Sequence, residues 1–166
     1  MDLAQFSEWG YGMIQIFGYP GLFLVNLISC SSVFFPLPGY VSVFIFGGIL
    51  SPFLVAIFSA FGAALGETTA YGVGWGGGYV LKKWQKRYFE MGKDWFSRGR
   101  GFWAIILFAA TPLPFDLIGI LAGIFNYNLK KFIFATFLGK MIMHLTLALA
   151  GFYGMEWILN VFKYGL

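Results

Sequence analysis

Long apolar runs interrupted by paired prolines dominate the sequence. Residues 22–35 are apolar, Pro36 and Pro38 interrupt them, and residues 39–50 are apolar again. Each arm has about 12 to 14 residues, which is roughly 18 to 21 Å of α-helix and too short to cross a hydrocarbon core of about 30 Å. Two short arms around a double proline therefore predict a re-entrant helical hairpin, which enters and leaves the membrane on one side.

A second hairpin of the same kind follows later in the chain. Residues 102–111 are apolar, Pro112 and Pro114 interrupt them, and residues 117–125 are apolar again. The polar segment Asn126-Tyr127-Asn128 then marks the end of the second arm.

The two hairpins are related by a fixed spacing. A shift of 76 positions places Pro36-Leu37-Pro38 on Pro112-Leu113-Pro114 and Gly47 on Gly123. A long apolar segment that can span a bilayer follows each hairpin. We therefore predict an all-α integral membrane protein of two repeats, each a re-entrant helical hairpin with a Pro-Leu-Pro tip plus a transmembrane helix.

This pattern predicts a single membrane domain that covers residues 1–166 and has five parts. They are an interfacial helix at 1–20 that ends at Tyr19-Pro20-Gly21, repeat 1 at 22–75 with its span at 53–75, a cytoplasmic basic amphipathic segment at 76–101, repeat 2 at 102–150 with its span at 132–150, and a C-terminal helix at 151–166. The last part is open to two interpretations, a short span or an interfacial helix.

The composition fits a membrane protein. Apolar residues make up 59% of the chain and charged residues only 11%, against about 25% charged residues in soluble domains. Seven of the eleven basic residues lie in one segment, residues 82–100. Cytoplasmic loops of membrane proteins carry such lysines and arginines, so we place the loop 82–100 in the cytoplasm and expect no nucleic-acid partner.

Charge also predicts the orientation of the repeats. The loop 82–100 and the pair Lys130 and Lys131 should lie on the same, cytoplasmic side. Residues 101–126 must then enter and leave on that side, as a re-entrant hairpin does. The Ser51-Pro52 turn carries no basic residue and is placed outside, so the two repeats are predicted to be inverted relative to each other.

Four ionisable residues fall within the predicted membrane segments: Glu67, Asp116, Lys140 and His144. A charge at membrane depth costs at least a few kcal/mol on insertion scales, so each is a candidate for a substrate or proton pathway. Lys140 and His144 are four residues apart and share one helix face. Glu67 is placed to pair with Lys140, although such a pair can also serve only to hold helices together. Asp116 can simply cap the second hairpin arm.

The hairpin tips are the second candidate site. Helix starts at membrane depth expose N–H groups and the positive end of the helix dipole, so opposed tips predict an anion site at the midplane. The alternative is that the prolines only kink two transmembrane helices. The tip residues are the prolines and the hydroxyls beside them, namely Pro36, Pro38, Pro112, Pro114, Ser31, Ser32 and Thr111.

Motifs of catalysis are absent from the sequence. It contains no Gly-x-Ser-x-Gly elbow, no His-Glu-x-x-His and no phosphate-binding Gly-x-x-x-x-Gly-Lys. The single cysteine, Cys30, allows neither a disulfide nor a cysteine-based metal site. We expect a protein that is not an enzyme and that needs no cofactor or metal.

Four stretches of the sequence resemble one family, the DedA or SNARE-associated Golgi proteins with their VTT domain, over about residues 18–150. These stretches are Ser31-Ser32-Val33-Phe34-Phe35-Pro36-Leu37-Pro38-Gly39, Gly62-Ala63-Ala64-Leu65-Gly66-Glu67 with Tyr71 and Gly74, Phe108-Ala109-Ala110-Thr111-Pro112-Leu113-Pro114, and Ala122-Gly123. By this resemblance, Glu67 occupies the acidic position of the family's glycine-rich stretch. Family members usually carry arginines around the second proline element, whereas Thr111 to Ile118 contains none. Lys140, His144 and the hairpin helix ends remain as the groups that could meet a phosphate.

The resemblance implies opposed re-entrant hairpins and lipid transport, with undecaprenyl phosphate recycling in bacterial members and phospholipid scrambling in eukaryotic relatives. It also implies proton coupling. We therefore expect a flippase or scramblase in the cell membrane whose partners are membrane lipids, including a phosphate-bearing lipid, and protons. The alternative is a proton- or ion-coupled exporter of a small solute. The sequence leaves a homo-oligomer open.

Overall fold

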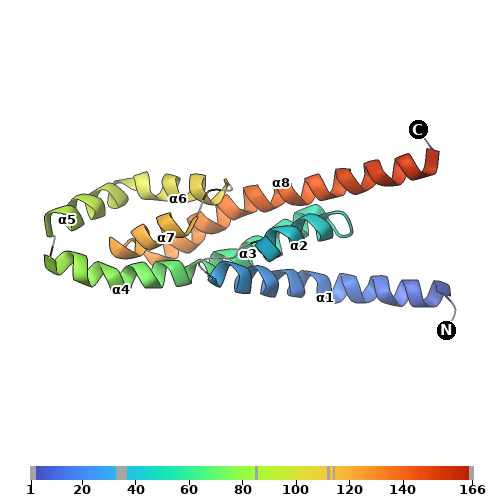
Figure 1. Cartoon of the computed structure of the whole chain (residues 1–166), viewed down its shortest axis with the longest axis horizontal. Helices are drawn as coiled ribbons and strands as arrows, with labels where there is room; N and C mark the ends of the chain where they lie inside the picture. The colour runs from blue at the N-terminus through green and yellow to red at the C-terminus, as the bar shows by residue number, and fades with distance from the viewer. Residues whose placement is uncertain (1–2, 33–36, 85, 112, 114, 165–166) are drawn as a thin grey trace.

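A computed structural model describes residues 3–32, 37–84, 86–111, 113 and 115–164, and all regular elements in these residues are helical. The elements are α1 (Leu3–Ser31), α2 (Leu37–Gly47), α3 (Pro52–Gly66), α4 (Thr68–Trp84), α5 (Lys86–Trp95), the π-helical turn η1 (Phe96–Arg100), α6 (Gly101–Ala109), α7 (Phe115–Ile124) and α8 (Leu129–Tyr164). The predicted all-α class is confirmed. Figure 1 shows an elongated bundle with both chain ends at one end and the turn from α4 to α5 at the other.

The first helix corrects a predicted boundary. The segment Tyr19-Pro20-Gly21 was expected to end an interfacial helix, but α1 runs through it from Leu3 to Ser31 with Pro20 inside. A proline removes one backbone hydrogen bond, and helices in a membrane environment tolerate this where neighbouring groups satisfy the freed carbonyl. The division of the chain at residue 20 is therefore wrong as a helix boundary.

Among the described residues, two segments are long and apolar enough to cross a membrane, as the sequence predicted. They are Pro52–Gly78, with 27 residues, and Leu129–Trp157, with 29 residues. The first comprises α3 and most of α4, and only Glu67 interrupts it. The second lies within α8, which continues without a break to Tyr164. A separate C-terminal helix starting at residue 151 is therefore not present.

The short helices lie against the spans in a crossed arrangement. Helix α1 packs on α3, and α6 packs on α8. Helix α2 contacts the later part of α8, and α7 contacts α4. In Figure 1, α2 leads from the middle of the molecule toward the end that carries the chain termini, whereas α7 leads from the middle toward the opposite end.

Glycines allow the helices to approach this closely. A Cβ atom at Gly62 would collide with the backbone of Phe23 on α1, and one at Gly139 would collide with the backbone of Ile106 on α6. Small residues serve the same purpose in membrane bundles, where close van der Waals packing replaces the hydrophobic effect between helices. Gly62 and Gly139 are thus explained by contact with the short helices, whereas a Cβ at Gly72, Gly76 or Gly77 would meet nothing within 4 Å.

The surface of the bundle is strongly apolar along its length. Many large hydrophobic side chains are more than half exposed, including Ile28 at 66%, Trp103 at 70% and Phe134 at 57%. A soluble monomer rarely exposes apolar side chains over so much of its surface. This outer surface is suited to contact with lipid.

Candidate functional site

A buried ion pair joins the two spans near the middle of the bundle. Lys140 Nζ on α8 lies 2.8 Å from Glu67 Oε1. Only 1% of Lys140 and 4% of Glu67 is exposed. The sequence predicted this pair, and its formation is confirmed. Glu67 is the single residue between α3, which ends at Gly66, and α4, which begins at Thr68. The carboxylate therefore lies at the interruption of the span.

Two aromatic residues complete the surroundings of the lysine. Lys140 Nζ donates a hydrogen bond to Tyr40 Oη on α2 at 3.3 Å. The same ammonium lies 5.2 Å from the centroid of the Phe115 ring on α7. Phe115 is the first residue of α7, and Tyr40 belongs to the first turn of α2. The starts of both short helices therefore contribute a side chain to the buried lysine.

His144 lies one helical turn beyond Lys140 and is completely buried. Its Nδ1 atom lies 2.8 Å from Ser59 Oγ on α3. The Ser59 hydroxyl donates to the backbone carbonyl of Val55 at 2.6 Å. Because a hydroxyl has one hydrogen to donate, this arrangement favours the tautomer in which Nδ1–H donates to Ser59. Nε2 is then an unprotonated acceptor.

Several buried polar atoms in this region have no hydrogen-bond partner among the described residues. They are Glu67 Oε2, His144 Nε2, Thr136 Oγ1 and Asn26 Oδ1. The Cys30 thiol lies close to Glu67 and is a weak donor at best. An unsatisfied buried polar atom costs about 1–3 kcal/mol. Such atoms therefore point to groups that find partners in another conformation or with a bound molecule.

Asp116 lies at the edge of this cluster. It is the second residue of α7 and is partly exposed, which agrees with a position in the first turn of a helix. It is close enough for the charge of Lys140 to act on it. The four ionisable candidates thus divide into three buried groups, Glu67, Lys140 and His144, and one group with access to the surface.

The hairpin tips are described only in part. Pro36, Pro112 and Pro114 lie outside the described residues, and Pro38 falls in the first turn of α2. Three hydroxyls belong to this region, namely Ser31, Ser32 and Thr111. The first and last bond back to their own helices, Ser31 Oγ to Leu27 O at 2.6 Å and Thr111 Oγ1 to Leu107 O at 3.1 Å. Ser32 is exposed.

Sequence reasoning missed four polar members of the site, which are Asn26, Tyr40, Ser59 and Thr136. Each is an uncharged polar residue in a largely apolar segment. Asn26 and Ser59 also each donate a hydrogen bond to a backbone carbonyl of their own helix. A search for every uncharged polar residue in the predicted spans would have found Ser59 and Thr136, since both are completely buried there.

Comparison with known proteins assigns the chain to a family. A family model described as the VTT domain matches residues 37–153. The chain belongs to the VTT-domain family. The family resemblance inferred from the sequence is thereby confirmed, and the VTT-domain match identifies the chain as a membrane protein. The matched region contains Glu67, Lys140 and His144, together with Tyr40 and Ser59.

The chain is also similar to a protein of Methanocaldococcus jannaschii that is described only as uncharacterized. The two are 28% identical over 149 residues, which cover 87% of this chain and 90% of the relative. No solved structure is similar enough to count as a match.

Proposed function

We propose that this protein translocates a lipid with a phosphate-bearing head group across the membrane, with Glu67 and Lys140 at the centre of the pathway. The observation that carries the proposal is the buried ion pair at the interruption of a membrane span. Burying a charge in a membrane protein is costly, and such residues mark ion and substrate pathways. The family resemblance supports a lipid as the substrate.

The inverted repeat predicted from the sequence would allow alternating access through the same residues, and two helix contacts support it. A Cβ at Gly47 would meet Ala148, and one at Gly123 would meet Tyr71. Residues 47 and 123 differ by 76, and residues 71 and 148 by 77. Each short helix thus contacts the span of the other repeat at an equivalent position. This crossed pattern is what a pseudo-two-fold axis would produce, and transporters built from such repeats bind substrate near the midplane.

Such an axis would also relate the polar residues of the site. With the shift of 77 that relates Tyr71 to Ala148, Ser59 would correspond to Thr136 and Glu67 to His144. The Ser59–His144 hydrogen bond of one half then has Thr136 and Glu67 as its counterpart. Both Thr136 Oγ1 and Glu67 Oε2 are buried and have no partner within the described residues. Thr136 is therefore our candidate to hold Glu67 when Lys140 leaves it.

A transport cycle follows from these positions. In the described conformation Glu67 neutralises Lys140, and neither is accessible. Protonation of Glu67 would release the ammonium to meet a phosphate. Asp116 is the second acid that would change its protonation during the cycle. We place the movement at Glu67, because this residue stands between α3 and α4 and belongs to neither helix. His144 Nε2 would accept the proton in transit.

The remaining sequence-based expectations belong to this proposal. The hairpins would be re-entrant, with tips that approach each other from opposite faces of the cell membrane. The basic loop 82–100 would lie in the cytoplasm. The protein would act as a transporter, not as an enzyme.

Reconstitution into liposomes tests the function. Purified protein would be incorporated with a fluorescent phospholipid or polyprenyl phosphate, and translocation would be followed by quenching from outside with dithionite. We expect wild-type protein to accelerate translocation and Glu67→Gln and Lys140→Met to abolish the acceleration. The matched control is Lys83→Gln, which removes a charge from the exposed basic segment and should translocate as wild type does.

A proton-sensitive dye inside the vesicles separates lipid transport from the alternative. Proton movement that depends on a lipid gradient supports coupled lipid transport. Proton movement that requires a small solute, without lipid translocation, would replace the proposal with export of that solute. Equal translocation by wild type and Glu67→Gln would remove Glu67 from the mechanism.

A further inference from the structure

A pocket lies away from the buried ion pair, at the end of the bundle that carries the basic segment. It has a volume of about 510 Å³ and lies between η1, the start of α6 and the turn from α7 to α8. Ligand pockets typically have volumes of about 300–1,000 Å³. Lys131 on its wall and Lys140 in the central site are nine residues apart on α8, which is roughly 14 Å along the helix.

The polar groups that line this pocket include two lysines and an asparagine. Lys93 and Lys131 line it and are exposed. In the part of the chain that the structure describes, neither lysine forms an ion pair, and no acidic residue lines the pocket. Asn128 Oδ1 accepts a hydrogen bond from the backbone N–H of Lys131 at 3.1 Å. The amide NH₂ of Asn128 thus remains free to donate to a ligand.

The turn that carries these groups is rigidly built. Asn126 has φ 54°, and the N–H of Tyr127 bonds to Ala122 O at 2.9 Å. This is the Schellman ending of a helix, with asparagine in the left-handed position that glycine usually takes. Tyr71 Oη donates to the carbonyl of Tyr127 at 2.6 Å and ties the turn to α4. The backbone that leads into Asn128 is therefore held in place before any ligand binds.

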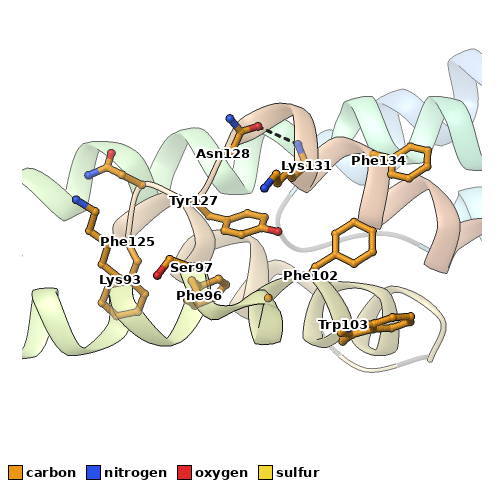
Figure 2. Close-up of a pocket in the computed structure, with 12 residues that line it drawn as sticks. Lys93, Phe96, Ser97, Phe102, Trp103, Phe125, Tyr127, Asn128, Lys131 and Phe134 are labelled. Carbon is orange, nitrogen blue, oxygen red and sulfur yellow. Dashed lines mark hydrogen bonds between the residues drawn. The ribbon is translucent and has the colours of Figure 1, made fainter.

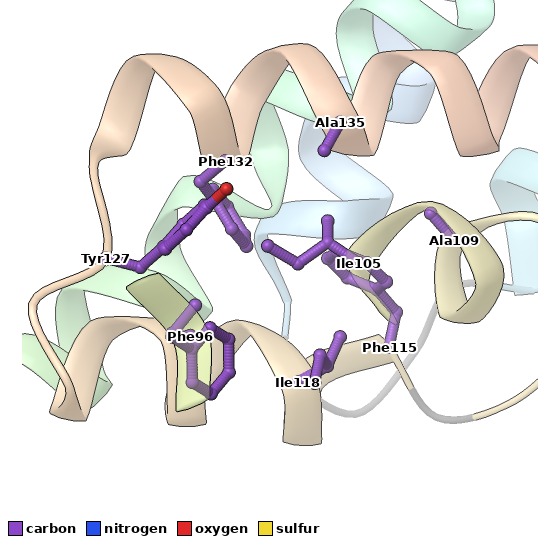
Figure 3. Packing of buried hydrophobic residues seen from close by; sticks show 9 residues of the cluster. Phe96, Ile105, Ala109, Phe115, Ile118, Tyr127, Phe132 and Ala135 are labelled. Carbon is purple, nitrogen blue, oxygen red and sulfur yellow. The ribbon is translucent and has the colours of Figure 1, made fainter. Parts of the chain in front are cut away.

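Aromatic side chains form the other side of the pocket. Figure 2 shows Phe102, Trp103 and Phe134 at the side facing the middle of the bundle, opposite Lys93. Phe96 and Tyr127 close the floor and belong to the buried cluster in Figure 3. Lys93 thus lies toward the end of the bundle and these three aromatic side chains toward its middle, which suits an amphiphile at a membrane interface.

An apolar groove continues from the aromatic side. It has a volume of about 420 Å³, and Phe134 lines both it and the pocket. Its other walls include Phe61, Ile133 and Phe137. A hydrocarbon chain that leaves the pocket past Phe134 can lie in this groove. The groove is what favours a lipid over a free phosphate ion.

We propose that this pocket binds an anionic membrane lipid, with the phosphate between Lys93, Lys131 and the Asn128 amide and an acyl chain along Trp103 and Phe134. Lysines at a membrane surface attract anionic lipid with about 1 kcal/mol each. The site is separate from the central ion pair. Binding does not depend on transport, so loss of translocation in a Glu67 variant leaves the inference standing.

Native mass spectrometry of the full chain in detergent tests the site. Phosphatidylglycerol and phosphatidylcholine would be titrated in parallel. We expect Lys93→Gln combined with Lys131→Gln to weaken phosphatidylglycerol binding by roughly tenfold or more. The matched control combines Lys83→Gln with Lys86→Gln, which removes the same charge from exposed positions outside the pocket. It should change binding by less than twofold.

The tail and the head group are tested separately. Trp103→Ala should weaken binding of the long-chain lipid, whereas Trp157→Ala, which removes an equally exposed tryptophan outside the pocket, should not.

Equal effects of the two lysine pairs would overturn the site in favour of general attraction to the basic segment. Equal binding of the two lipids would overturn the anionic head group. If inorganic phosphate displaced phosphatidylglycerol and bound with the same affinity, the ligand would be a phosphate ion and not a lipid.

Discussion

Lys140 Nζ contacts Glu67 Oε1 at 2.8 Å across the interface of α8 and α3, and both side chains are buried. The two residues are 73 positions apart in the sequence. The lysine also donates a hydrogen bond to Tyr40, whereas Glu67 Oε2 has no hydrogen-bond partner among the described residues. Removing one member leaves the other charge buried without compensation.

The first prediction concerns the stability of this pair. Glu67→Gln or Lys140→Met alone should lower the free energy of unfolding by about 3–5 kcal/mol, because each leaves an uncompensated buried charge. The double variant should recover most of the loss, since both charges are then absent. Unfolding in mixed micelles with increasing SDS measures the difference.

The double variant also separates folding from transport. If the pair only holds helices together, a double variant with restored stability should translocate lipid at the wild-type rate. If the pair belongs to the pathway, as we propose, the double variant should be stable and inactive. A double variant no more stable than either single one would contradict the electrostatic explanation.

The second prediction compares two hydroxyls related by the proposed repeat. Ser59→Ala removes the partner of His144 Nδ1 and should cost about 1–3 kcal/mol of stability. Thr136→Val removes a buried hydroxyl that has no partner in this conformation, so stability should stay equal or rise. Thermal unfolding in detergent measures both.

The rates of lipid translocation should rank these two variants differently from their stabilities. If Thr136 holds Glu67 during the cycle, Thr136→Val slows translocation although the protein is as stable as wild type. Unchanged translocation in Thr136→Val would remove this residue from the cycle. A strong loss of stability would show that the hydroxyl has a partner in the resting state.

The third prediction concerns helix contact. A Cβ at Gly62 would collide with the backbone of Phe23, whereas one at Gly72 meets nothing within 4 Å. Gly62→Ala should therefore force α1 away from α3 and destabilise the bundle. Gly72→Ala should raise stability by up to about 1 kcal/mol, because alanine favours a helix more than glycine does. The same unfolding assay measures both, and equal effects would contradict the close packing.

Much of the fold was predictable because charges and prolines are rare in apolar segments. Glu67 and Lys140 had to find partners in the membrane, so their pairing followed from the sequence. Ser59 did not stand out, since a serine hydroxyl can bond to its own helix or to a distant group, and only the fold decides. Tyr40 did not stand out either, since only the fold brings its hydroxyl to Lys140. The packing of α2 on α8 was also hidden, because it depends on contacts between distant glycines and backbone.

The errors came from treating breaker residues as boundaries. Pro20 lies inside α1, and the run Gly76-Gly77-Gly78 lies inside α4. Within the glycine run, Gly78 is required by a contact that the sequence does not reveal, because a Cβ there would collide with the backbone of Ile124 on α7. Glycine and proline end helices in water, where exposed backbone can bond to solvent. In a membrane bundle the same residues allow close contact between helices.

The fourth prediction distinguishes Asp116 from the buried pair. Asp116 is partly exposed in the first turn of α7, where a negative charge favours the helix by about 0.3–1 kcal/mol. Asp116→Asn should therefore cost less than about 1 kcal/mol of stability.

If Asp116 carries a proton during the cycle, the variant should still translocate lipid far more slowly than wild type, and its rate should lose the pH dependence that the carboxyl group confers. Translocation measured from pH 5 to 8 gives both readouts. A wild-type rate and pH profile in Asp116→Asn would restrict this residue to the start of the helix, and Glu67 would then be the remaining acid in the cluster to carry the proton.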